Sequence, residues 1–132
     1  MDDGVRRITG TRLIDHDGAI QHGDFLLHRD GSYSASKGDE DVIESIDGST
    51  RLVTRSLQNW HTHLAMILNR SMGEGLPLME WLETSIFPVE KGLTAEFVEV
   101  GTRAAVAEMI STGTTFACDM YYHPDVVAGV LV

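Results

Sequence analysis

The chain has only one cysteine, Cys118, among its 132 residues. A lone cysteine cannot form an internal disulfide, so nothing in the sequence requires an oxidising compartment. Long apolar runs are also missing, because the longest, from Val126 to Val132, is far shorter than the roughly 20 residues of a membrane-spanning helix. The start, Met-Asp-Asp-Gly, is acidic, whereas a secretion signal begins with basic and then apolar residues. We therefore expect a cytoplasmic protein with no membrane partner.

Basic residues are scarce as well. Lys37 and Lys91 are the only lysines, and the 10 basic residues are outnumbered by 20 acidic ones, which gives a formal net charge of −10. The negative electrostatic field of such a chain repels phosphate backbones, so nucleic acid is not expected as a partner. The hydrophobic share of 42% is enough for a packed core, which indicates a globular protein.

The first part of the chain reads as strands. Short apolar runs alternate with turn residues, and these runs are residues 6–9, 12–14, 24–28 and 42–46. Asp-Gly pairs lie between or beside them at Asp17-Gly18, Asp30-Gly31 and Asp47-Gly48, and Asp-Gly favours tight hairpin turns because glycine accepts a positive φ. The sequence therefore predicts a small all-β domain over residues 1–55.

From about Ser56 the hydrophobic period changes from two residues to about 3.6. A short strand is expected over residues 57–60, followed much later by a helix over residues 95–112. Thr94 can cap this helix, Gly113 can end it, and its expected apolar face is formed by four residues, Phe97, Val100, Ala104 and Ala107.

After this helix, residues 114–118 are β-branched and apolar with little alternation, as in a parallel strand buried on both faces. His123-Pro124-Asp125 then opens another helix, with proline in its first turn. The order strand, helix, strand, helix is the beginning of an α/β array. A complete (β/α)8 barrel takes about 250 residues, whereas only 75 residues follow Leu57. We therefore expect residues 56–132 to hold the first units of a barrel that is incomplete in this chain.

Two histidines at a strand end are the strongest chemical signal. His61 and His63 are separated by one residue, and in an extended chain such residues point to the same side. Both imidazoles can then reach one ion, and neutral imidazole suits Zn²⁺. The spacing alone also permits two histidines that only make local hydrogen bonds. His16, His22 and His28 lack this spacing, and we interpret them as structural or exposed.

The surroundings of this pair resemble the amidohydrolase superfamily, in particular 5-methylthioadenosine and S-adenosylhomocysteine deaminases and related chlorohydrolases. The likeness covers about everything after Leu52, and it rests on the segments at residues 58–66, 77–82, 87–94, 111–115 and 119–123. It implies a metal-dependent hydrolase barrel preceded by a small accessory sheet domain. It also implies one divalent metal, zinc first and iron second, held by His61 and His63 with further ligands from later strands.

The same resemblance places Glu90 where nucleoside deaminases bind the substrate ribose, although a solvated glutamate before a helix is the alternative. Trp81 could line the same pocket or belong to the core, since it lies among apolar residues at helical spacing. Asp119 ends the second strand, where it could orient a metal-bound imidazole or simply form a turn or a cap. No residue that performs the chemical step itself is visible in this chain.

The resemblance implies hydrolysis of a C–N bond, most simply the hydrolytic deamination of a small purine-type nucleoside. Chlorohydrolase or guanine-deaminase chemistry is the alternative within the family. From a different class, the chain could be a non-catalytic truncated fragment, or one half of an enzyme completed by another chain. We expect the 132-residue chain alone to be inactive and to be oligomeric, aggregated or partly molten, because its barrel and its ligand set are incomplete.

Overall fold

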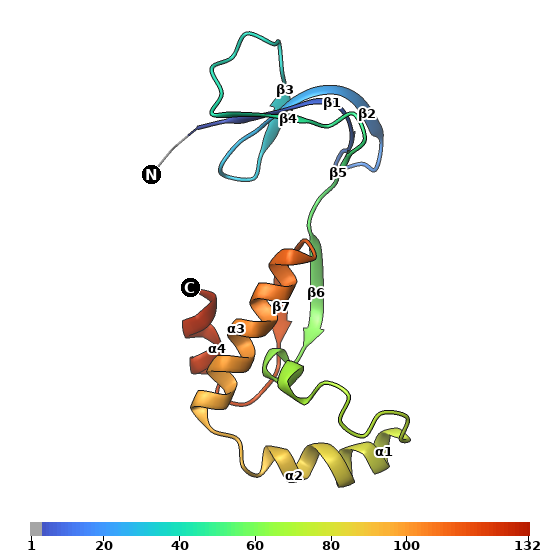
Figure 1. Cartoon of the computed structure of the whole chain (residues 1–132), viewed down its shortest axis with the longest axis vertical. Coiled ribbons are helices and arrows are strands. Elements are labelled where there is room, and N and C mark those ends of the chain that lie inside the picture. The colour runs from blue at the N-terminus through green and yellow to red at the C-terminus, as the bar shows by residue number, and fades with distance from the viewer. Residues whose placement is uncertain (1–3) are drawn as a thin grey trace. The chain divides into compact units, whose positions relative to one another are not determined.

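The computed structural model describes residues 4–132 and divides the chain into two compact units between Arg55 and Ser56 (Figure 1). The first unit contains only strands and turns in its described residues, and the second mixes two strands with helices. Within residues 4–132, no helix combines the length and the apolar content that crossing a bilayer requires.

The first unit is built on one five-stranded sheet. Its strands are β1 (Arg6–Ile14), β2 (Ile20–Leu27), β3 (Tyr33–Ala35), β4 (Glu44–Asp47) and β5 (Leu52–Val53). The long β1 is the centre of the sheet: β2 pairs with it antiparallel on one side, and β4 and β5 pair with it parallel. Ile8, Leu13 and Phe25 form the buried core of this unit.

The strand β1 joins two runs that the sequence predicts as separate strands. A register shift between Ile8 and Thr11 marks a bulge, and Gly10 lies there with a φ of 62°. The Gly10 amide, which the bulge takes out of the ladder, donates a hydrogen bond of 2.7 Å to Asp24 Oδ1. The two runs are therefore one strand, and the bulge explains the break in the hydrophobic pattern between them.

The predicted Asp-Gly turns are confirmed at two of three places. Gly18 and Gly31 both have a φ of 83°. Gly48 has no positive φ, so the prediction of a left-handed turn there is wrong. It is buried instead, and a Cβ at this position would lie 2.6 Å from the Thr11 Cβ. Glycine is needed at position 48 because the chain passes close to β1.

The second unit contains a parallel pair of strands joined by a long helical crossover. Its elements are β6 (Leu57–Thr62), η1 (Leu64–Asn69), α1 (Leu78–Trp81), η2 (Leu82–Ile86), α2 (Phe87–Glu90), α3 (Ala95–Ser111), β7 (Thr114–Asp119) and α4 (Pro124–Leu131). β6 and β7 pair in parallel, which requires such a crossover connection. Figure 1 shows the segment from α1 to α2 beyond the carboxyl end of β6.

The predicted long helix is confirmed as α3, and Thr94 Oγ1 caps it by accepting a hydrogen bond of 3.1 Å from the Phe97 amide. The predicted apolar face is not the face that packs in the second unit, because Val100 is 52% exposed. The buried face instead comprises Val98, Gly101, Thr102 and Ala105. Two of these residues are not counted as apolar, so the hydrophobic pattern does not reveal the contact face.

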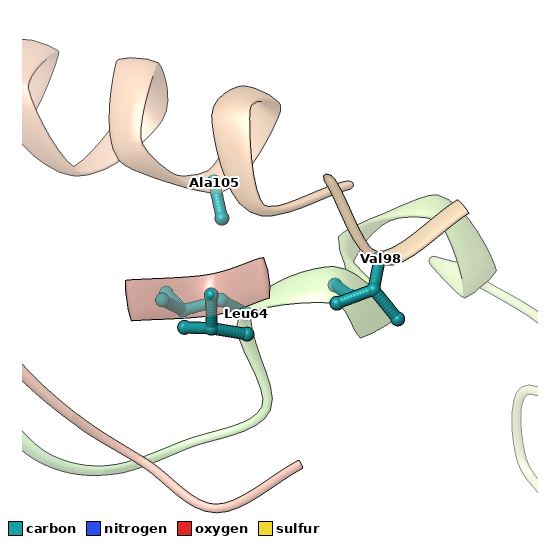
Figure 2. Close-up of a cluster of buried hydrophobic side chains, with 5 residues drawn as sticks. Leu64, Val98 and Ala105 are labelled. Atoms are coloured by element: carbon teal, nitrogen blue, oxygen red, sulfur yellow. The ribbon is translucent and has the colours of Figure 1, made fainter. Parts of the chain in front are cut away.

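The core of the second unit lies where α3 covers η1 and α4. It comprises Leu64, Ala65, Val98, Ala105 and Val127, of which Figure 2 labels Leu64, Val98 and Ala105. Ala117 of β7 packs against this cluster, but Phe116 beside it is 38% exposed. The expectation that this strand is buried on both faces is therefore wrong, because the cluster covers β7 from one side only.

Candidate metal and substrate site

The site lies at the carboxyl ends of the two parallel strands. β6 extends two residues beyond the predicted strand, so His61 belongs to the strand and His63 follows its last residue. Thr62 pairs with Asp119 at the end of β7. Parallel strands bring their carboxyl ends to one edge of a sheet, so the residues that follow Asp119 lie beside His63. In α/β enzymes, catalytic and ligand-binding residues lie at this edge of the sheet.

The rings of His61 and His63 lie side by side. Their centroids are 5.2 Å apart and their planes are inclined by 83°. Imidazole nitrogens bind zinc at about 2.0–2.1 Å, so two rings that share one tetrahedral ion have centroids about 5 Å apart. The observed separation therefore leaves room for a shared ion. Among residues 4–132, no third His, Cys, Asp or Glu joins this pair in a compact cluster.

The orientation of His63 is fixed by the backbone that follows β7. The Nδ1 atom of His63 lies 2.8 Å from the Met120 carbonyl oxygen. A carbonyl only accepts, so Nδ1 carries the proton and Nε2 keeps the lone pair that a metal needs. Of the two roles open to Asp119, the structure favours the cap, because Asp119 Oδ1 accepts a hydrogen bond of 2.6 Å from the Leu64 amide at the start of η1.

The helical segment over residues 78–90 brings two predicted substrate residues to this edge. Its middle part, η2, is a π-helix, a rare form found often at functional sites. Trp81 lies just before η2 and Glu90 ends α2. The Trp81 Nε1 atom donates a hydrogen bond of 2.7 Å to the Met72 carbonyl oxygen, which fixes the indole.

A cavity of about 390 Å³ lies between the end of the strand pair and the helical segment over residues 78–90. It is lined by His63, Met66, Trp81, Leu82, Ile86, Glu90, Met120, Tyr121 and Tyr122. Three of the four predicted site residues thus share one cavity, and His61 lies outside its lining but in contact with the His63 ring. An aromatic and apolar wall with one carboxylate and one imidazole is typical of a small-molecule site.

Tyr121 lines the same cavity, and sequence reasoning did not single it out. Its ring centroid lies 5.8 Å from that of His63, and its hydroxyl is buried without a hydrogen bond of good geometry. Burial raises the pKa of Tyr121, and the negative charge of the nearby Glu90 raises it further. No spacing rule singles out a tyrosine two residues after a strand, so only the fold reveals this neighbour.

Other metal-capable side chains gather in the first unit. Asp15, His16 and Asp17 lie close together in the turn between β1 and β2. Asp15 Oδ1 already accepts hydrogen bonds from the amides of Asp17 and Ala19, so the turn explains the cluster. A larger cavity of about 550 Å³ also lies in this unit, but none of the predicted site residues lines it. The histidine pair therefore stays the candidate site.

None of the remaining histidines lines the cavity beside His63. His22 is exposed, and His28 Nε2 lies 3.0 Å from Ser34 Oγ. His123 precedes α4 with a φ of 54°, and its side chain makes no capping hydrogen bond. The helix instead begins with the backbone carbonyl of His123, which accepts from the Val126 amide at 3.0 Å.

Comparison with known proteins agrees with this geometry. The chain is 43% identical over 114 residues to a 5-methylthioadenosine/S-adenosylhomocysteine deaminase of Nitratidesulfovibrio vulgaris, a match that covers 86% of this chain and 26% of that protein. It is 39% identical over 132 residues to a 5'-deoxyadenosine deaminase of Methanothermobacter thermautotrophicus, covering 97% of this chain and 30% of the relative. This chain thus spans less than a third of these relatives.

A solved structure shows the same fold. The crystal structure of an adenosine deaminase from Xanthomonas campestris with bound zinc superposes with a TM-score of 0.82 at 27% identity, covering 95% of this chain and 30% of that one. The model of the amidohydrolase family matches residues 52–131, which include the histidine pair and the whole cavity lining. The chain therefore belongs to the amidohydrolase family.

Proposed function

We propose that this chain supplies the first part of the active site of a metal-dependent hydrolase that removes an amino group from a purine nucleoside. The observation that carries the proposal is the shared cavity, which brings His63, Trp81 and Glu90 together beside His61. The two sequence relatives are named as deaminases of adenosine derivatives, which supports this substrate class.

His61 and His63 are the residues that would hold the metal. The donor set fits, because the Met120 carbonyl leaves Nε2 of His63 free to bind. We propose zinc, in line with two imidazole ligands and the zinc in the related deaminase structure. When bound, a divalent metal makes water nucleophilic at neutral pH.

Glu90 and Trp81 would hold the substrate. The Glu90 carboxylate is half-buried at the cavity wall, where it can accept hydrogen bonds from two neighbouring sugar hydroxyls. The Trp81 indole is fixed through its Nε1 atom, and its ring offers a flat apolar surface to a purine or a sugar. Both residues would bind and orient the nucleoside without taking part in bond breaking.

We further propose that the second unit is the beginning of a (β/α)8 barrel and that the first unit is part of an accessory sheet domain. Two imidazoles alone make an incomplete ligand set, so the remaining ligands and the proton-transferring groups would come from further strands. These strands would belong to the same protein or to a completing chain. The 132 residues alone would then release no ammonia.

The test is zinc-dependent ammonia release from adenosine and 5'-methylthioadenosine by the complete protein that contains this chain. We expect activity to disappear after chelation and to return with zinc. Glu90→Gln should raise KM for both nucleosides, whereas Glu96→Gln, an exposed change in α3, should not. Ammonia release that survives chelation, or none from either nucleoside with zinc present, would refute the proposal.

A further inference from the structure

Tyr121 holds the one buried hydroxyl of the cavity lining that makes no hydrogen bond of good geometry with a described residue, although Glu90 lies near it. Its ring packs against the core cluster of the second unit, so the position of the ring is fixed. Its hydroxyl, in contrast, lies near the Glu90 carboxylate, and both residues line the cavity. A phenylalanine would pack equally well and would avoid leaving a polar group unsatisfied. The hydroxyl therefore needs an explanation beyond packing.

The surroundings of the hydroxyl identify its partner. A tyrosine keeps its proton at neutral pH and can donate one hydrogen bond. Glu90 is the one carboxylate in the cavity lining, and ionised carboxylates only accept. Tyr121 also contacts the His63 ring, with centroids 5.8 Å apart. The residue thus lies between the candidate metal ligand and the candidate sugar-binding carboxylate.

We propose that Tyr121 is a positioning residue, whose hydroxyl donates a hydrogen bond to Glu90 and so orients this carboxylate toward the vicinal hydroxyls of a ribonucleoside. This inference rests on the proposed function, because it assigns Tyr121 to the same substrate site. Bonding one oxygen of Glu90 to Tyr121 leaves the other lone pairs directed at the sugar. The enzyme then prefers ribonucleosides to nucleosides without these hydroxyls.

Equilibrium dialysis of the complete, metal-free protein with adenosine and with 2',3'-dideoxyadenosine tests the proposal without any turnover. We expect Tyr121→Phe to weaken adenosine binding about three- to tenfold, the range that one lost hydrogen bond produces. Binding of the dideoxy compound should stay the same, because it has no hydroxyls for Glu90 to accept. Tyr33→Phe, the same change in the first unit, is the matched control and should alter neither affinity.

A second variant separates positioning from packing. If Tyr121 acts through Glu90, Glu90→Gln combined with Tyr121→Phe should bind adenosine about as weakly as Glu90→Gln alone. Two results would overturn the role of Tyr121 even if Glu90→Gln weakens adenosine binding. Tyr121→Phe could weaken the binding of both compounds equally, or it could weaken the binding of neither. If Glu90→Gln has no effect either, the proposed substrate site itself is wrong and the role of Tyr121 falls with it.

Discussion

At the scale of single residues, the two histidines could be found from sequence because their spacing carries a geometric rule. Residues i and i+2 of a strand share a face, and the structure places the rings of His61 and His63 in contact. Tyr121 follows no such rule, since its role depends on the end of β7 lying next to His63. For Asp119 the sequence left two roles open, and the hydrogen bond that its Oδ1 atom accepts from the Leu64 amide favours a cap at the start of η1.

A second residue-scale effect concerns the stability of the first unit in acid. The Lys37 amide is the main cause that holds the pKa of Glu40 at about 2, with help from Ser36 and Arg7. A carboxyl whose pKa is lowered by folding stabilises the folded state above its unfolded pKa, near 4.5, and this contribution is lost as pH falls toward 2. Asp15, Asp30 and Asp47 have lowered pKa values as well.

We therefore predict that the first unit loses stability as the pH falls from about 4.5 to about 2. Glu40→Gln should be less stable than the unsubstituted chain at pH 6 and should lose less on going to pH 3. Urea unfolding at both pH values measures this difference. Asp39→Asn removes an exposed neighbouring carboxylate and should leave the loss intact. An identical loss in Glu40→Gln would show that this carboxyl does not contribute.

At the scale of elements, the hydrophobic period and the capping residues predicted the long helix and the strands on either side of it. Thr94 and Gly113 lie at the two ends of α3 as expected. The short strands β3 and β5 were not foreseen, because three and two residues are too few for a pattern. The buried face of α3 was missed because its closest contact uses glycine, which hydrophobic patterns ignore.

Gly101 provides a test of that contact. A Cβ at this position would lie 2.6 Å from the Ala65 carbonyl oxygen and 2.8 Å from the Ala65 Cα, and backbone atoms cannot yield as a flexible side chain can. We predict that Gly101→Ala destabilises the second unit by about 1–3 kcal/mol, because overpacking outweighs the better helix propensity of alanine. Thermal or urea unfolding gives this value.

The matched control is Gly129→Ala in α4, where a Cβ meets nothing within 4 Å. Alanine there should leave stability unchanged or raise it by up to about 1 kcal/mol, since only helix propensity changes. If both substitutions have the same effect, the close approach of α3 to η1 is not a determinant of the fold.

At the scale of the whole molecule, the hydrophobic period changes near Ser56, and the sequence predicts an accessory sheet domain before this point and barrel units after it. The structure divides into compact units between Arg55 and Ser56. The second unit leaves apolar surface open. Leu57 is 62% exposed and Trp60 is 67% exposed, and the Trp60 ring lies against Phe116 with centroids 4.6 Å apart.

Exposed apolar groups and a two-stranded sheet with open edges favour association. We predict that the purified 132-residue chain sediments as oligomers or aggregates. Replacing Trp60 and Phe116 together by serine should lower the average mass, whereas Ile20→Ser, an exposed apolar site of the first unit, should not. A monodisperse monomer with a sharp melting transition would show that the chain closes its own core.

The central claim is that His61 and His63 hold one divalent metal, and zinc affinity measured by competition with a coloured chelator tests it most directly. We predict that His61→Ala and His63→Ala each weaken zinc binding by the complete protein at least about tenfold, because each removes a ligand. His16→Ala removes the histidine of the cluster in the first unit and should leave this affinity unchanged. Unchanged zinc affinity in both His61→Ala and His63→Ala, or a loss confined to His16→Ala, would contradict the account.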